Sequence, residues 1–161
     1  MQADSTQDRS LEVRPADLDH PGIAALLATH TRRARGAARC RPGHALGTDA
    51  LRDPAIEVWS LWRNDAPVAV GAIRRLSGEH GELKSMFVAD GERGNGIGRV
   101  LLAHLIDAAK RRGMTRLSLE TGTSEYFDAA RRLYGRQGFE ACEAFADLPA
   151  HSDSVFMARL I

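Results

Sequence analysis

Short stretches of alternating apolar and polar residues predict several β-strands. Residues 11–14 alternate until Pro15 stops the pattern. Residues 56–62 and 68–76 are apolar runs on either side of a polar turn, which is typical of an antiparallel hairpin. Residues 82–88 alternate at first and end in a continuous apolar run, so we expect a central strand here. Three shorter strands are expected at residues 116–120, 139–142 and 154–159.

Other stretches repeat apolar residues at helical spacing. The clearest is 96–112, where cations in the last turn complement the helix dipole. A first helix is expected to begin near Pro21 with Asp17 or Asp19 as its cap, followed by a loop over residues 35–47. The apolar face of this first helix comprises Ile23, Leu26, Leu27 and His30. Further helical segments are expected at residues 46–52 and 126–137.

This order of elements predicts a mixed α+β fold. We expect a central, largely antiparallel sheet of six to seven strands with helices on both faces. A Rossmann fold is disfavoured because helices do not alternate with strands from the start. Residues 1–10 are polar and predict a flexible tail, which leaves residues 11–161 as a single domain. A chain of this size can bury a core without metals or disulfides.

Charge gives the chain no general affinity for polyanions. Its 22 Lys and Arg residues nearly balance its 21 Asp and Glu residues, for a formal net charge of +1. Neither nucleic acid nor an anionic membrane is therefore an expected partner. No run approaches the ~18 apolar residues of a membrane span, and the chain start lacks the apolar segment of a signal peptide. We therefore expect a cytoplasmic protein.

One local asymmetry of charge stands out in the first half of the chain. Five arginines follow one another with no acid between them: Arg32, Arg33, Arg35, Arg39 and Arg41. They form either a solvated helix end and loop or a basic rim that attracts an anionic substrate or a cofactor phosphate.

The two cysteines, Cys40 and Cys142, form no CxxC pair, and the chain has no His cluster at metal-ligand spacing. We expect reduced thiols and no bound metal. Cys142 could carry a covalent acetyl group, but its place after Phe139 is typical of sheet core.

The segment from Arg93 to Arg99 is the strongest candidate for a binding site. It follows a strand that ends at Val88 and leads into a helix, so its backbone N–H groups can hold an anion. Gly94, Gly96 and Gly98 permit close approach, and the two arginines add charge. A tight strand-helix turn is the alternative. No Walker lysine follows, and the spacing is not the dinucleotide GxGxxG.

Two motifs resemble hallmarks of the GCN5-related N-acetyltransferase (GNAT) superfamily. Arg93, Gly96 and Gly98 match its pyrophosphate-binding loop, and the run 133–139, with Tyr134 and a Gly-Phe end, is similar to its second hallmark. Residues 82–86, 119–122 and 154–157 also resemble one bacterial branch of small acetyltransferases of mostly unassigned substrate, so that the likeness covers roughly residues 44–159.

This resemblance implies a GNAT fold with splayed fourth and fifth strands and acetyl-CoA as the co-substrate. Phe127 stands where many relatives carry an Asn that bonds the cofactor. The residues expected at the cofactor are Met86, Phe87, Val88, Arg93, Gly94, Asn95, Gly96, Ile97, Gly98, Arg99 and Phe127.

The resemblance also implies roles in catalysis. Tyr134 is expected to act as general acid for the departing thiolate. Glu82 or Glu120, directly or through water, is expected to act as base and to hold the substrate ammonium; water alone is the alternative. His44 and Phe145 are expected to bind substrate, because they lie in the variable segments before the second strand and before the last one. His44 could also act as base, and an ordinary surface histidine is the alternative.

The expected function is transfer of acetyl from coenzyme A to the primary amine of a small metabolite, by direct attack in a ternary complex. A protein or peptide N-acetyltransferase and a non-catalytic acyl-CoA sensor are the alternatives. A nucleotide phosphotransferase is disfavoured by the missing Walker lysine. The last strand could pair across a homodimer.

Overall fold

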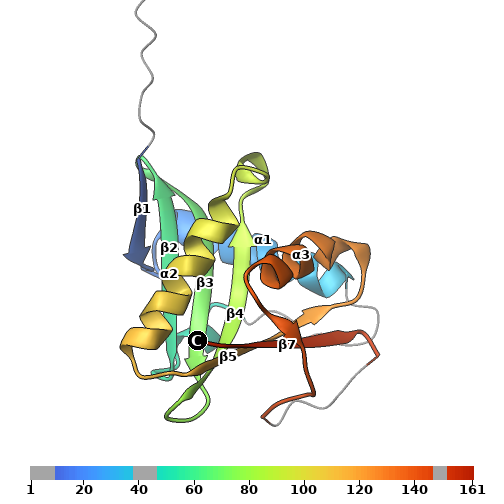
Figure 1. Ribbon diagram of the computed structural model, residues 1–161. Coiled ribbons are helices and arrows are strands. Elements are labelled where there is room, and N and C mark those ends of the chain that lie inside the picture. The colour runs from blue at the N-terminus through green and yellow to red at the C-terminus, as the bar shows by residue number, and fades with distance from the viewer. Residues whose placement is uncertain (1–9, 38–46, 147–151) are drawn as a thin grey trace, which may run out of the picture.

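The computed structural model describes residues 10–37, 47–146 and 152–161. Within these ranges the strands form one seven-stranded sheet in the order β1-β2-β3-β4-β5-β7-β6 (Figure 1). Neighbours are antiparallel except for β4 and β5, which are parallel. The strands are β1 (Leu11–Pro15), β2 (Ile56–Arg63), β3 (Ala66–Arg75), β4 (His80–Val88), β5 (Arg116–Gly122), β6 (Glu140–Ala141) and β7 (Ser154–Leu160). The predicted mixed, largely antiparallel sheet is confirmed.

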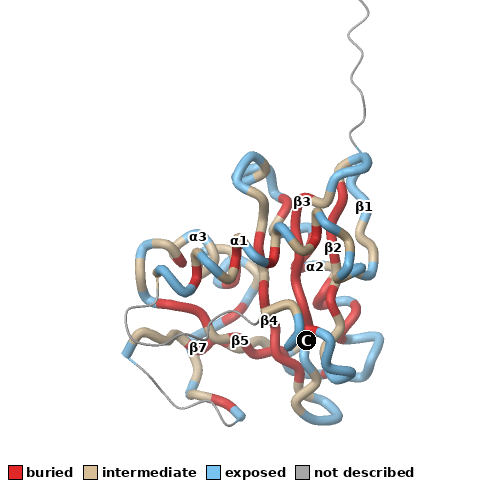
Figure 2. The backbone as a smooth tube through the Cα atoms, turned by 180° about the vertical axis from the view of Figure 1, so that it is seen from behind, coloured by how far each residue is buried: buried red, intermediate tan, exposed pale blue. Residues whose placement is uncertain are grey.

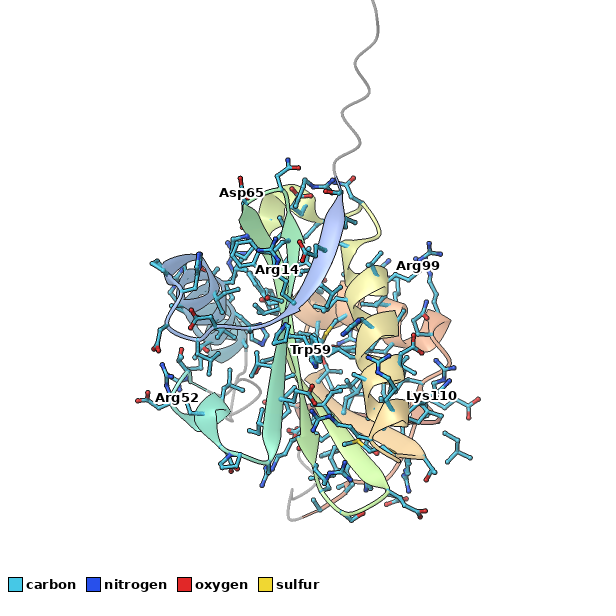
Figure 3. The ribbon with its side chains drawn as sticks, turned by 90° about the vertical axis from the view of Figure 1, so that its left-hand side faces the viewer. Arg14, Arg52, Trp59, Asp65, Arg99 and Lys110 are labelled. Carbon is cyan, nitrogen blue, oxygen red and sulfur yellow. The ribbon has the colours of Figure 1, made fainter. Side chains whose placement is uncertain are left out.

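Helices cover both faces of the sheet, as predicted. Seen along its edge, α1 lies on one side of the sheet and α2 on the other (Figure 3). The helices of the described ranges are α1 (Pro21–Ala37), α2 (Ile97–Arg111) and α3 (Asp128–Arg136), with 3-10 turns η1 (Ala50–Arg52), η2 (Asp90–Glu92) and η3 (Glu125–Phe127).

Each face of the sheet has its own apolar layer. On α2, Leu101 and Leu105 are fully buried one turn apart and pack in one cluster with Leu117 of β5. On α1, Ile23 and Leu27 are buried against the opposite face. Buried positions follow β3 and β4 through the middle of the molecule (Figure 2). A buried leucine contributes about 2 kcal/mol, so these layers fix both helices on the sheet.

The central strand β4 bends where it meets its neighbours. Opposite Val70 and Ala72 the β3–β4 register shifts, and Ser85 takes φ 55°, so β4 carries a bulge at this point. The parallel pairing with β5 ends at Leu83 and Leu119, although β4 continues to Val88. Beyond that pair the two strands diverge, with β4 upright and β5 running across it (Figure 1). The expected splay is confirmed.

Several local predictions need correction. Helix α1 continues to Ala37 and does not stop before residue 35, because Ala34 in its last turns packs against Phe127. Its first turn is capped by His20, whose Nδ1 accepts the Gly22 N–H at 3.1 Å. Neither Asp17 nor Asp19 fills this role. The helix expected at residues 126–137 is divided into η3 and α3. The tail over residues 1–9 and the loop over 38–46 lie outside the described residues.

Candidate active site

A cleft opens where β4 and β5 part. The space between its walls, including the open mouth, is about 600 Å³. Five of the predicted site residues meet here: Glu82, Met86, Glu120, Phe127 and Tyr134. The described residues that line the cleft are His30, Glu82, Leu83, Lys84, Ser85, Met86, Glu120, Thr121, Phe127, Ala130 and Tyr134. The splay therefore exposes side chains from α1, β4, β5, η3 and α3 to one space.

Glu82 is paired with Lys84 inside this cleft. The two residues are two apart on β4, so their side chains share one face of the strand. Lys84 Nζ lies 2.8 Å from Glu82 Oε1. The Glu82 side chain is 3% exposed and that of Lys84 is 16% exposed, so Lys84 is the more accessible member of the pair. Lys84 was missed at the sequence level, although the strand period places it beside Glu82.

Glu120 is the second carboxylate of the cleft. Because Glu82 lies opposite Ser118 in the parallel register, Glu120, two residues after Ser118 and one beyond the last shared pair, projects from the same face. The Ser154 hydroxyl of β7 donates a hydrogen bond to Glu120 Oε1 at 2.9 Å. This bond orients one carboxylate oxygen and ties β5 to β7 at the edge of the cleft.

Tyr134 brings a phenol to the cleft from the end of α3. Gly138 has φ 84°, which lets the chain reverse after the helix, and the Phe139 N–H donates to the Tyr134 carbonyl at 3.0 Å. The two rings pack edge to face with centroids 5.9 Å apart. Burial raises the pKa of the Tyr134 phenol well above its ordinary value, so the group keeps its proton at neutral pH.

The glycine loop between η2 and α2 has the geometry of an anion site. Gly94 and Gly96 take φ values of 81° and 76°, in the left-handed region that favours glycine, and Gly96 directly precedes α2. A Cβ added to either would meet no atom within 4 Å. The helix N-terminus is therefore open in front of Asn95, which is exposed.

Gly98 has a different role from the other two glycines. A Cβ at this position would lie 3.1 Å from Leu133 Cδ2, so the missing side chain lets α2 pack closely against α3. Ile97 is buried in the core under α2. Gly98 and Ile97, two of the residues expected at the cofactor, therefore contribute to the packing of α2.

The arginines near the loop occupy three distinct positions. Arg93 Nε donates to the Val88 carbonyl at 3.3 Å, and its guanidinium lies 5.5 Å from the Phe87 ring centre. Arg99 projects from the outer side of α2 into solvent (Figure 3). Arg33 of α1 donates two hydrogen bonds to Asp90, and these bonds lower the pKa of that carboxyl. Arg33 thus ties α1 to the turn before the glycine loop. Of the five clustered arginines, Arg39 and Arg41 lie outside the described residues.

Phe127 closes the cleft on the side of η3. Its ring packs against Ala34 of α1, so the first helix and η3 meet across the gap between β4 and β5. Gly122 makes room for this ring, since a Cβ there would collide with the ring carbons. Phe127, which stands where many relatives carry an Asn, therefore has a packing role. Gly122 at the end of β5 provides the space for its ring.

Phe145 lies beside the cleft and does not line it. Its buried ring packs against the rings of His80 and Phe156, with centroid separations of 5.9 Å and 5.6 Å. His80 Nε2 is 2.7 Å from Ser118 Oγ, at the paired end of β4 and β5. The predicted substrate residue His44 falls outside the described residues.

Two buried polar atoms of the cleft were missed by sequence reasoning. His30 Nδ1 and Ser85 Oγ are both buried without a hydrogen-bond partner among the described residues. Burial, assisted by the charge of Arg93, lowers the pKa of His30 to about 4, so its imidazole is neutral. Unpartnered buried polar atoms are costly and are commonly satisfied by a ligand or water.

Other chemistry finds less support in the described ranges. No group of three or more His, Cys, Asp or Glu side chains there is placed to hold a metal ion. Cys142 directly follows β6 and is partly buried, and burial raises the pKa of its thiol, which disfavours the reactive thiolate. None of the described helices is long and apolar enough to cross a bilayer.

The chain is similar in sequence to known acetyltransferases. The family model described as acetyltransferase (GNAT) family matches residues 22–139. The uncharacterized N-acetyltransferase YsnE of Bacillus subtilis is 44% identical over 116 residues, which cover 72% of this chain and 77% of that protein. The uncharacterized N-acetyltransferase YedL of Escherichia coli is 37% identical over 146 residues, covering 91% and 92%.

A solved structure shares the fold. A GNAT family acetyltransferase of Elizabethkingia anophelis, solved with acetyl-CoA bound, superposes with a TM-score of 0.70 at 18% identity, covering 96% of this chain and 100% of that one.

Proposed function

The chain belongs to the acetyltransferase (GNAT) family, and we propose that it transfers the acetyl group of acetyl-CoA to the primary amine of a small metabolite, by direct attack within a ternary complex. The observation that carries this proposal is the meeting of Glu82, Glu120 and Tyr134 in the cleft between β4 and β5. These groups supply the two proton transfers that the reaction needs.

The donor is held along β4 and at the glycine loop. Past Leu83, β4 has β3 on one side and the cleft on the other, so the main chain of Met86, Phe87 and Val88 offers an edge to which an extended ligand can add. The N-terminus of α2, opened by Gly94 and Gly96, suits the pyrophosphate of coenzyme A. Arg93, beside the end of β4, adds a positive charge next to this path.

The acceptor amine is placed by the two carboxylates. Glu82 and Glu120 project from one face of the diverging strands, where their charges favour an ammonium ion. Glu82 then takes a proton from this ammonium ion, directly or through a water molecule, because only the neutral amine has a lone pair for attack.

Acetyl transfer forms a C–N bond and breaks a C–S bond. The amine nitrogen attacks the thioester carbonyl carbon, and the tetrahedral intermediate collapses with breakage of the C–S bond. Tyr134 gives its phenolic proton to the sulfur as negative charge develops there. Its raised pKa keeps this proton on the phenol until that moment. The second proton that the nitrogen loses on becoming an amide restores the phenol, directly or through water. The products are an amide and free coenzyme A.

Release of free thiol from acetyl-CoA across a panel of amines tests the proposal. We expect turnover with a subset of small primary amines and little release without an amine. Thiol release that needs a peptide or protein acceptor would favour the peptide N-acetyltransferase. Binding of acetyl-CoA with no release for any amine would favour a sensor and contradict the proposal.

A further inference from the structure

The cleft contains one cation whose role acetyl transfer does not explain. Among the described residues that line it, Lys84 alone carries a positive charge, since His30 is neutral. Lysine is rare in this chain: Lys84 and Lys110 are the two lysines among the 22 Lys and Arg residues. A lysine ammonium is a compact charge that can exchange partners, whereas an arginine fork tends to lock on one carboxylate.

Stability does not account for the Lys84–Glu82 pair. A buried ion pair loses hydration on both sides, and well-packed apolar residues of similar size often stabilise a fold as well or better. This pair also lies within one strand, two residues apart, so it ties no separate elements together. Its position in the cleft is better explained by a ligand that carries complementary charges.

The unused hydrogen-bonding groups lie next to Lys84. Within the described residues, Lys84 donates to Glu82 alone, although an ammonium has three donors. Ser85 follows it directly at the bulge, lines the same cleft and is 5% exposed, and its buried hydroxyl has no hydrogen-bond partner in the described part of the chain. An ammonium and a hydroxyl side by side are suitable donors for a carboxylate.

We propose that the acceptor is a short amino acid whose carboxylate is bound by Lys84 and Ser85 while its amine lies against Glu82. Because Lys84 Nζ and Glu82 Oε1 are 2.8 Å apart, a ligand that pairs with both has its own charged groups only a few bonds from each other. An α-, β- or γ-amino acid meets this condition, whereas a long diamine does not. This inference rests on the proposed acetyl transfer.

The test compares each acceptor with its own carboxamide. Acetylation is measured for the twenty standard amino acids, β-alanine and 4-aminobutyrate beside their carboxamides, with rates expressed per unprotonated amine, since the amide group alters the amine's basicity. For the preferred acceptor we expect kcat/KM to exceed that of the carboxamide about 10- to 100-fold, the range for a hydrogen-bonded charge pair.

Three variants locate the source of this ratio. In Lys84→Gln the preference should fall to about 3-fold or less, and in Lys84→Arg part of it should return. In Lys110→Gln, a matched control on the exposed end of α2, the preference should be unchanged. The ratio is internal to each variant, so a loss of folded protein does not affect it.

The outcomes separate the two proposals. Transfer to amines with no preference for the carboxylate, or a preference that survives in Lys84→Gln, overturns the amino-acid inference and leaves acetyl transfer intact. Absence of transfer to every amine overturns the proposed function and the inference with it.

Discussion

At the scale of single residues, the Tyr134 hydroxyl is the group whose chemistry can be isolated most cleanly. Tyr134→Phe removes the proposed proton donor and keeps the ring that packs against Phe139. We expect kcat to fall by about 10²-fold or more, as for other general acids, with little change in thermal stability. Steady-state rates and a melting curve check this. A variant with full turnover and an unchanged pH profile would remove Tyr134 from the mechanism.

His30 gives a residue-scale prediction about stability. Its pKa falls from 6.5 to about 4 on folding, so between these pH values the unfolded chain binds the extra proton and the folded chain does not. The free energy of unfolding therefore falls as pH drops through this window. The His30 contribution amounts to about 3 kcal/mol at most.

Urea unfolding at pH 7.5, 6.5, 5.5 and 4.5 measures this effect. The free energy of unfolding should change less with pH in His30→Gln, because glutamine does not titrate. The difference between the two proteins isolates the contribution of His30 from that of other groups. Parallel pH dependences in the two proteins would show that His30 is not buried in its neutral form.

At the scale of elements, the end of β5 and the turn η3 form one packing unit. Gly122→Ala would place a methyl group against the Phe127 ring, which lines the cleft. We expect a loss of about 1–3 kcal/mol in the free energy of unfolding and a lower kcat/KM, because the ring must move. Gly135→Ala on α3 is the matched control: its added Cβ meets nothing within 4 Å, so alanine should stabilise the helix slightly.

A second substitution tests the cause of that loss. Phe127→Leu in the Gly122→Ala background makes room for the new methyl group and should recover part of the stability. If Gly122→Ala unfolds at the same urea concentration as the unchanged chain, the contact with Phe127 does not restrict this glycine.

The sequence predicted the elements more fully than it predicted the lining of the cleft. Strand alternation and helical spacing are local, and they placed β2, β3 and α2 within a few residues. The Tyr134 motif is local in the same sense. His30 shows the limit: helical spacing predicted its burial, but only the packing of α1 against β4 brings it to the cleft beside Ser85.

The bulge at Ser85 and the packing of Gly98 also could not be predicted from local sequence patterns. No local signal marks Ser85 for a positive φ, because the register of β3 against β4 imposes it. The sequence pattern predicted Gly98 as part of the anion loop, yet the side chain nearest to it is that of Leu133, thirty-five positions away in the chain. Such contacts depend on tertiary structure, and no local sequence pattern marks them.

At the scale of the whole molecule, the splayed sheet separates two approaches to one reacting centre. In the mechanism we propose, the glycine loop and the edge of β4 hold the donor, while the face carrying Glu82, Lys84 and Glu120 holds the acceptor. Direct transfer between two ligands bound side by side follows from this arrangement. The proposed mechanism has no acetyl-enzyme intermediate, and Cys142 is not among the described residues that line the cleft.

Mass spectrometry after incubation with acetyl-CoA labelled with carbon-13 in the acetyl group tests this central claim most directly. The reaction contains the unchanged protein and the best amine of the panel, and both the amine and the intact protein are weighed. We predict that the label is found in an N-acetylated amine, in amounts equal to the thiol released, and that the protein mass is unchanged. Label retained on the protein, or thiol released without labelled amide, would contradict direct acetyl transfer.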